Sequence, residues 1–284
     1  MALGFPRSCG KDLGGNTYSA DTRLLLGEAS RRTGLSESQT EGMSIMHAKA
    51  VRTTLAAVTV VAALGTAGTT PAAAGTAAAK YPGQVKCPKG DYQLCIDGGP
   101  GGFTISGKTF SGHQNAIRLK NVSNVKITGN TFKNLSGPDG FGGVHVLNSS
   151  KIVITKNNFS NLKNKGKMHG VYLVKTSGST ITSNKFSSIS GDPVRIRDRS
   201  SNNTVSGNTF TKSGTYAMFS EWRDPAKGEA CGSGNIFKNN KYGIGYYGKR
   251  ISLIKWGGWT KKDETTWGHC TKASIVNKGG NKKI

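Results

Sequence analysis

One sequence unit occurs four times between Ala116 and Phe210, and this repeat restricts the possible fold more than any other feature of the chain. Each unit holds two short segments of alternating apolar and polar residues, and it closes with an asparagine followed two positions later by a phenylalanine. The four phenylalanines, spaced by 27, 27 and 24 residues, are Phe132, Phe159, Phe186 and Phe210. Self-similarity at this period indicates a solenoid. The segments are short, β-branched and punctuated by glycine and asparagine, which favours strands over helices.

Stacking the units predicts columns of equivalent side chains. Alternation places one apolar column inside, formed by Ile117, Val144, Val171, Val194 and Met218. The asparagines Asn130, Asn157, Asn184 and Asn208 are expected to form an internal ladder at a turn, since asparagine tolerates unusual backbone angles and can bond to the next coil.

This pattern resembles the right-handed parallel β-helix of pectate-lyase-like proteins, over roughly residues 103–242. The fold class predicted is therefore all-β, a right-handed parallel β-helix. A segment rich in glycine, lysine and aromatic residues follows, from Tyr246 to Ile284. We interpret it as a cap whose aromatic side chains cover the exposed core, with sugar stacking as the alternative role of Trp256, Trp259 or Trp267.

The chain before the repeats divides into two parts. Residues 1–45 are polar and unpatterned, and we interpret them as upstream sequence from a mis-assigned start, with an extended leader as the alternative. Residues 46–79 have the features of a secretion signal: basic residues, an apolar run from Leu55 to Leu64, and then small residues. That run is too short to span a membrane. Residues 80–284 are expected to form the β-helix domain.

Charge predicts the class of partner. The chain carries 39 Lys and Arg against 15 Asp and Glu, a formal net charge of +24. Residues 1–74 hold 7 basic and 5 acidic residues, so the remainder still has a net charge of +22. A charge this dense favours a polyanionic partner. For a secreted protein we expect an acidic polysaccharide, because no nucleic-acid-binding motif is present. We expect neither a membrane nor a nucleic-acid partner, and a monomer.

Cysteine usage agrees with export, since four cysteines remain after the leader. Cys87 and Cys95 bracket a short loop before the first coil, and Cys231 and Cys270 flank the end of the solenoid. Disulfides in that pairing would secure both ends, where a β-helix has open strand edges. The spacing fits no structural zinc pattern, and no cofactor is predicted.

The strongest functional signal lies on the outward face of the first strand in each unit. The nearer outward column is predicted as Arg118, His145, Tyr172, Arg195 and Phe219, and the next as Lys120, Leu147, Val174, Arg197 and Glu221. The second strands instead carry threonine, serine and lysine. Adjacent coils lie about 4.8 Å apart, so these columns should form one continuous patch.

Two ten-residue connections, after Phe132 and after Phe159, are expected to form a wall beside this patch. The second contains Lys163, Lys165 and Lys167 and ends at His169. We expect catalysis from Tyr172, His145, His169, Arg195 and Arg197, and substrate binding by Arg118, Lys120, Lys167 and Glu221. Glu221 is also expected to orient Arg197, and Asp192 is interpreted as a turn residue. His113, before the first full coil, is the weakest candidate.

These residue types suit the eliminative cleavage of a uronate polymer. A cation must neutralise the uronate carboxylate, a base must remove the C5 proton, and an acid must protonate the departing O4 oxygen. The arginines suit the first task, and the histidines and Tyr172 suit the other two. The layout resembles that of parallel β-helix polysaccharide lyases. The chain lacks an acidic cluster for calcium and the Arg-x-Pro-x-x-Arg motif of pectate lyases, so metal independence is expected.

Two other functions compete with this prediction. A glycoside hydrolase needs two carboxylates at its site, and acidic residues near the patch are few. Non-catalytic binding of a polyanion needs only the basic surface. Hyaluronan, other glycosaminoglycans, alginate and glucuronan all remain possible polymers.

Overall fold

The structure is a computed structural model that describes residues 80–88, 91–138, 140–257 and 270–284. The proposed upstream extension and signal peptide, and two of the three tryptophans assigned to the cap, lie outside these residues. Within the described part, no helix is long and apolar enough to cross a membrane.

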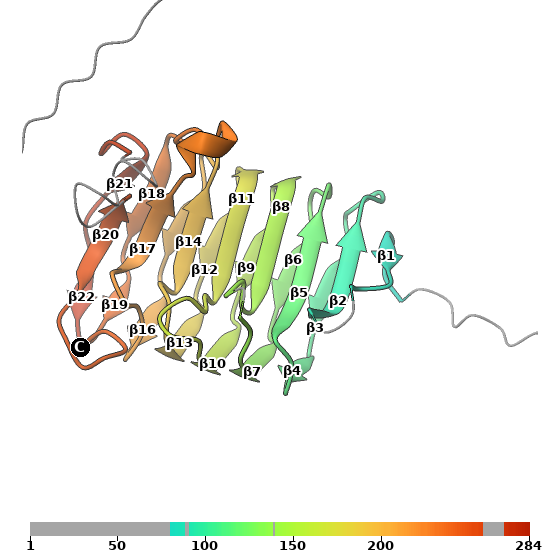
Figure 1. The fold of residues 1–284 in the computed structure, drawn as a ribbon, viewed down its shortest axis with the longest axis horizontal. Helices are drawn as coiled ribbons and strands as arrows, with labels where there is room; N and C mark the ends of the chain where they lie inside the picture. Colours follow the sequence, from blue (N-terminus) through green and yellow to red (C-terminus); the bar gives the residue numbers. More distant parts are fainter. Residues whose placement is uncertain (1–79, 89–90, 139, 258–269) are drawn as a thin grey trace, which may run out of the picture. The chain divides into compact units, whose positions relative to one another are not determined.

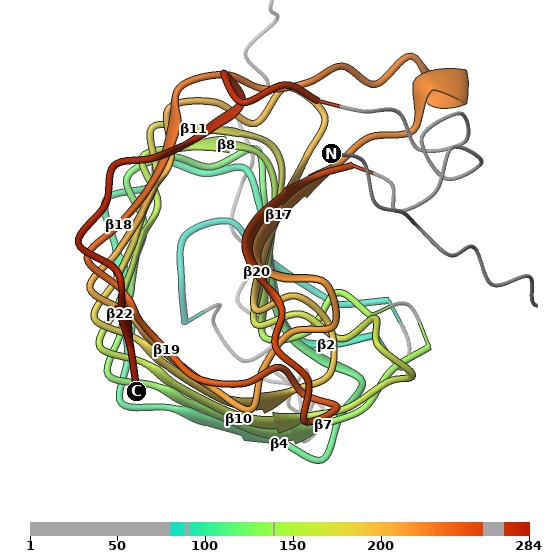
Figure 2. The same cartoon turned by 90° about the vertical axis from the view of Figure 1, so that its left-hand side faces the viewer.

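The chain winds through three sheets, and every coil contributes one strand to each (Figures 1 and 2). All strand pairs are parallel except β1 with β2. We name the sheets A, B and C. Sheet A contains β1 (Gln84–Val85), β2 (Tyr92–Asp97), β5 (Asn115–Lys120), β8 (Val144–Ser150), β11 (Val171–Ser177), β14 (Val194–Arg197), β17 (Ala217–Trp222) and β20 (Ser252–Trp256).

Sheets B and C carry shorter strands. Sheet B contains β3 (Thr104–Ser106), β6 (Lys126–Thr128), β9 (Val153–Thr155), β12 (Thr180–Thr182), β15 (Thr204–Ser206), β18 (Asn235–Lys238) and β21 (Ile275–Asn277). Sheet C contains β4 (Thr109–Ser111), β7 (Thr131–Leu135), β10 (Asn158–Leu162), β13 (Lys185–Ile189), β16 (Thr209–Thr211), β19 (Lys241–Tyr242) and β22 (Lys282–Lys283). A 3₁₀ turn, η1 (Pro225–Lys227), follows β17.

The phenylalanine column is internal, as predicted. Phe132, Phe159, Phe186 and Phe210 are fully buried. Their rings stack at centroid distances of 4.5, 4.7 and 5.0 Å from one coil to the next. The spacing between adjacent coils is similar to the distance between the centroids of two offset-stacked rings. Equivalent phenylalanines in successive coils therefore stack on one another.

The asparagine ladder is also internal and extends beyond the four predicted members. Each backbone N–H donates to the side-chain oxygen of the asparagine one coil further on, at 2.9 Å. The ladder begins at Asn130 and continues through Asn240 to Asn281. These bonds satisfy polar groups in the interior that water cannot reach.

The β-helix is longer at both ends than residues 103–242. At the start, β2 supplies a strand that pairs with β5. At the end, β20, β21 and β22 form a further coil, so the described residues after Tyr246 are not merely a cap. The coils lengthen here, since successive ladder asparagines are 32 and then 41 residues apart, and this hides the repeat in the sequence.

Both predicted disulfides are present. Cys87 bonds to Cys95 beside the first strand of sheet A, and Cys231 bonds to Cys270 near the last coil. The antiparallel pairing of β1 with β2 covers the open edge of sheet A at the N-terminal end.

Candidate functional site

The outer face of sheet A brings together most of the predicted site residues. The register aligns Arg118, His145, Tyr172 and Arg195 across β5, β8, β11 and β14, as the sequence predicted. The next member is Ser220, not Phe219, and Trp222 takes the place predicted for Glu221. In β17 five consecutive residues are buried, so this strand lacks the alternation that would have given its register.

Glu221 is therefore not a substrate-binding residue on the outer face, and it does not orient Arg197. Its side chain points inward and is fully buried, and its Oε1 accepts a hydrogen bond of 2.6 Å from the backbone N–H of Gly232. Burial raises the pKa of its carboxyl group.

Aromatic and imidazole rings form a closed cluster above sheet A. Phe141 stacks on His145 with a distance of 4.4 Å between ring centroids. The centroid of the Tyr172 ring lies 5.2 Å from that of His145 and 5.4 Å from that of His169. Tyr172 is only 6% exposed and the two histidines are no more exposed than that. The first long connection therefore covers the site through Phe141, rather than standing beside it as an open wall.

Two glycines allow Phe141 to take this position. Gly140 and Gly142 both have positive φ angles, 75° and 79°. A Cβ on Gly142 would lie against the backbone oxygen of His169, and one on Gly140 against that of Lys167. The two long connections are thus packed backbone to backbone, and other residues at these positions would force them apart.

His145 is held neutral in this cluster. Its Nδ1 shares a hydrogen bond of 2.6 Å with the Tyr92 hydroxyl, and its buried Nε2 has no partner among the described residues. Burial, with a smaller contribution from Arg118, lowers its pKa to about 3. The imidazole is therefore uncharged at neutral pH.

His169 is neutral too, and its tautomer is defined by geometry. Its Nδ1 lies 2.7 Å from the backbone oxygen of Asp192, which can only accept, so Nδ1 carries the hydrogen. Burial, and then Arg195, lower its pKa to about 3. Nε2 consequently holds a lone pair, the arrangement that a general base requires.

Asp192 is the centre of this hydrogen-bond network, not simply a turn residue. Its carboxylate accepts bonds from the backbone N–H groups of Tyr216 and Ala217, from the Ser220 hydroxyl at 2.6 Å, and from Arg195 Nη2 at 2.9 Å. Burial alone would raise the pKa of Asp192, but Arg195 and the other donors hold it below its usual value. Sequence reasoning missed this role, although the acid stands three residues before an outward arginine.

Both predicted carboxylate-binding arginines already have acidic partners. Arg195 bonds to Asp192, and its guanidinium carbon lies 5.0 Å from the centre of the Trp222 ring. Arg197 pairs with Glu229 at 2.5 Å and with Asp224 at 3.6 Å. Burial would lower the pKa of Arg197, but the Glu229 and Tyr172 side chains together outweigh burial and raise the pKa.

The remaining predicted cations differ in availability. Lys120 forms an ion pair of 2.9 Å with Asp97, and Lys167 is exposed on the second long connection. Arg118 is half-buried beside His145 and forms no ion pair with any described residue within 4 Å. Arg118 is therefore the sheet A arginine with the most capacity for an added anion.

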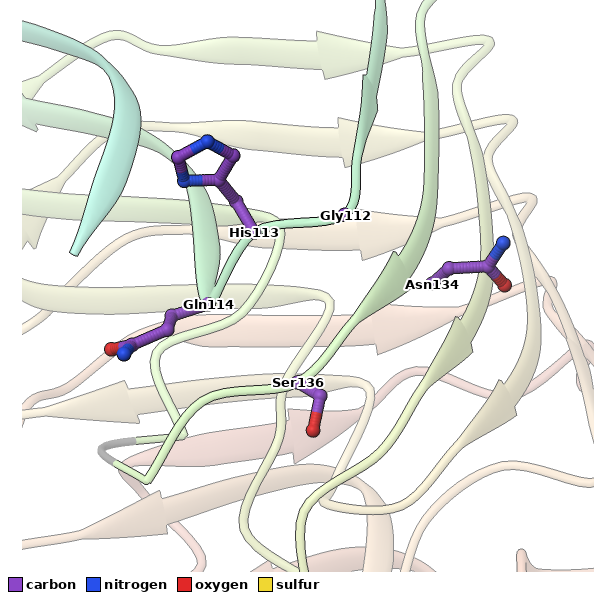
Figure 3. A pocket seen from close by; sticks show the side chains of 5 residues that line it. All are labelled: Gly112, His113, Gln114, Asn134 and Ser136. Atoms are coloured by element: carbon purple, nitrogen blue, oxygen red, sulfur yellow. The ribbon is translucent and has the colours of Figure 1, made fainter. Parts of the chain in front are cut away.

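His113 does not join the site. It lines a hollow of 380 Å³ with Gln114, Asn134 and Ser136, but the labelled side chains point in different directions (Figure 3). In the described part of the chain, no three His, Cys, Asp or Glu residues are grouped as a metal site.

Comparison with known families agrees with this architecture. A family described as the right handed beta helix region matches residues 94–254, more than half of the chain. The chain belongs to the right-handed β-helix family. Its members share a fold, and a fold by itself assigns no reaction.

Similar solved structures include DFA-IIIase from Arthrobacter chlorophenolicus A6. A mutant of that protein in complex with DFA-III is 14% identical, with a TM-score of 0.34, covering 64% of this chain and 50% of the other. The complex with GF2 is 13% identical, with a TM-score of 0.32 and the same coverage. The chain thus spans about half the length of these proteins, and at this level they carry no argument about its activity. The curated proteins contain no match to the chain.

Proposed function

We propose that the protein is a secreted polysaccharide lyase that cleaves an acidic, uronate-containing polymer by β-elimination. One observation carries the proposal: His169, whose Nδ1 carries the hydrogen, stacks on Tyr172 at a ring-centroid distance of 5.4 Å, and Tyr172 pairs in register with Arg195. A base with a free lone pair and a hydroxyl donor thus lie together on the basic outer face of sheet A.

The elimination divides between these groups. His169 Nε2 removes the proton from C5 of the uronate, and the electrons of that C–H bond form the C4–C5 double bond. The C4–O4 bond breaks, and the Tyr172 hydroxyl protonates the departing oxygen. His169 holds the proton taken from C5, and a final exchange with solvent restores both side chains.

The substrate carboxylate supplies the remaining requirement. Arg118 lies beside His145 and Arg195 beside Tyr172, so the two arginines can bind the substrate carboxylate from either side of this pair. Positive charge next to the carboxylate makes the C5 proton more acidic. Burial and the Arg195 charge lower the pKa of His169, and an anion bound beside His169 would raise that pKa. His169 is therefore a stronger base when the substrate is bound. Access requires movement of Phe141, because the rings are nearly buried.

A panel of polyuronates tests the proposal through the ultraviolet absorbance of the unsaturated product. Tyr172→Phe should lower kcat while leaving binding nearly unchanged, since only the proton-donating oxygen is lost. Arg195→Ala should lower kcat by roughly a hundredfold or more, as loss of one oxyanion donor does. Tyr247→Phe, at an exposed tyrosine, is the matched control. Full activity of Tyr172→Phe would exclude Tyr172 as the acid.

A second candidate function is non-catalytic binding of the same polyanions. The covered histidines and the compensated arginines favour it, because a catalytic site must admit its substrate. It predicts affinity that falls steeply with salt, since screened attraction supplies much of the energy, and no unsaturated product from any polymer.

A further inference from the structure

A polar trough runs beside sheet A, where each coil bends away from its outward columns. It is an open hollow of about 460 Å³, and the residues that line it over three successive coils include Asn121, Ser123, Asn148, Ser150, Lys175 and Ser177. None of these residues belongs to the cluster around Tyr172. They follow directly in the chain after the second outward column of Lys120, Leu147 and Val174.

The bend that forms the trough recurs at one position in each coil. Asn121, Asn148 and Lys175 have φ angles of 55°, 43° and 48°, in the left-handed region. Val122, Ser149 and Thr176 then turn inward and are buried. The exposed side chains on either side therefore repeat in register from coil to coil.

One side of the trough is a ladder of amides. Asn148 Nδ2 donates to Asn121 Oδ1 at 2.8 Å, and Asn121 Nδ2 donates to Asp97 at 2.8 Å. Each amide is thereby held in a fixed orientation while remaining exposed. Lys175 extends the row with an ammonium group whose side chain is 54% exposed, although it lies 3.3 Å from Asp198.

The other side is a row of serine hydroxyls. Ser123, Ser150 and Ser177 are aligned by the strand pairing of consecutive coils. Among the described residues, the hydroxyl groups of Ser123, Ser150 and Ser177 have no hydrogen-bond partner. Three aligned hydroxyl groups, on the half-exposed Ser123 and Ser150 and the exposed Ser177, are therefore available to donate and accept at intervals of one coil, about 4.8 Å.

We propose that this trough is a saccharide-binding site, separate from the Tyr172 cluster, that holds a polysaccharide chain parallel to the axis of the β-helix. A repeat of hydroxyl, amide and ammonium groups at one-coil spacing suits a polymer whose hydroxyl groups recur at a similar interval, and Lys175 favours an acidic one. The choice of an acidic polysaccharide rests on the proposed function. The inference that the trough binds a saccharide does not depend on it.

The test uses Ser150→Glu/Ser177→Glu, which replaces two unbonded hydroxyls by carboxylates. The matched control is Ser106→Glu/Ser111→Glu, which places the same charge on exposed serines of sheets B and C. Binding of hyaluronan and alginate decasaccharides is measured by calorimetry, in a Tyr172→Phe background that lacks the proposed proton donor. We expect the trough variant to bind at least one of them at least fivefold more weakly than the control does.

Two further measurements separate this proposal from the lyase. Ser150→Ala/Ser177→Ala should also weaken binding, because it removes the hydroxyls without adding charge. Trough-dependent binding without unsaturated product from any polymer would support the trough and refute the lyase. Equal affinities of the trough variants and the control, or no binding of either decasaccharide, would overturn the trough, even if unsaturated product forms.

Discussion

Asp192 bonds to His169 and Arg195 through different atoms: its backbone oxygen accepts from the imidazole at 2.7 Å, and its carboxylate accepts from the guanidinium at 2.9 Å. One buried residue thus sets the tautomer of the proposed base and compensates the charge of the neighbouring cation. Because Asp192 also receives bonds from Ser220 and two backbone N–H groups, its position ties β14 to β17.

Asp192→Asn should destabilise the fold strongly. Removing one partner of a buried pair leaves an uncompensated charge, at a cost of about 3–5 kcal/mol. Urea unfolding measures the change. Asp97→Asn, in the exposed pair with Lys120, should cost less than about 1 kcal/mol. A similar small cost at both positions would show that the Asp192 network is not structural.

The free energy of unfolding should fall as the pH drops from about 6.5 towards 3. The pKa values of His145 and His169 are lowered to about 3 in the folded state, so below about 6.5 the unfolded state binds more protons. Each histidine contributes a slope of up to about 1.4 kcal/mol per pH unit. The lowered pKa of Asp192 adds a loss in the same direction below its usual value near 3.8. Denaturation at several pH values should show a smaller slope for His145→Phe than for the exposed control His113→Phe.

Phe141→Ala should raise the pKa of His145 towards its ordinary value, because burial is the principal cause of the shift. Proton NMR titration of the histidines measures it directly. Phe103→Ala, at a half-buried ring of the first coils, should leave the His145 titration unchanged. An unaltered pKa in Phe141→Ala would mean that the strands and the other rings, not Phe141, keep water away.

Asn184→Ala should cost several kcal/mol. It removes a buried side chain that accepts a bond from Asn157 and donates to Ile154 and Asn208, and the partners left unsatisfied cost about 1–3 kcal/mol each. Asn158→Ala, at an exposed position of β10, is the control and should change stability little. Thermal unfolding of the two variants measures the difference. Equal stability of Asn184→Ala and Asn158→Ala would show that the asparagine ladder does not stabilise the fold.

The two disulfides should contribute unequally. Cys231–Cys270 closes a separation of 39 residues and Cys87–Cys95 one of 8, so loop-closure entropy predicts about 4 and about 2.5 kcal/mol respectively. Paired Cys→Ala variants, compared by urea unfolding, measure both. A larger loss at Cys87–Cys95 would indicate that securing the N-terminal strand matters more than loop length.

The repeat alone determined the coil, the internal phenylalanine and asparagine columns, and the outward alignment of Arg118, His145, Tyr172 and Arg195. A period-two strand assigns each side chain to a face, and a fixed repeat length aligns equivalent positions, so both follow from local sequence. The same logic identified the ends that the disulfides secure.

Only the tertiary structure decided how the site is closed and compensated. Phe141, Asp192 and Glu229 come from connections, where no periodicity fixes a side chain. Phe141 and Asp192 contact His145 and Arg195, which follow them closely in the chain, whereas Glu229 reaches Arg197 from the connection after β17. Glu221 lies in a strand whose residues are nearly all buried, so alternation gave no register there. Local pattern specifies the scaffold because strand geometry is local, whereas charge compensation and burial depend on the conformation of irregular connections and on contacts between coils.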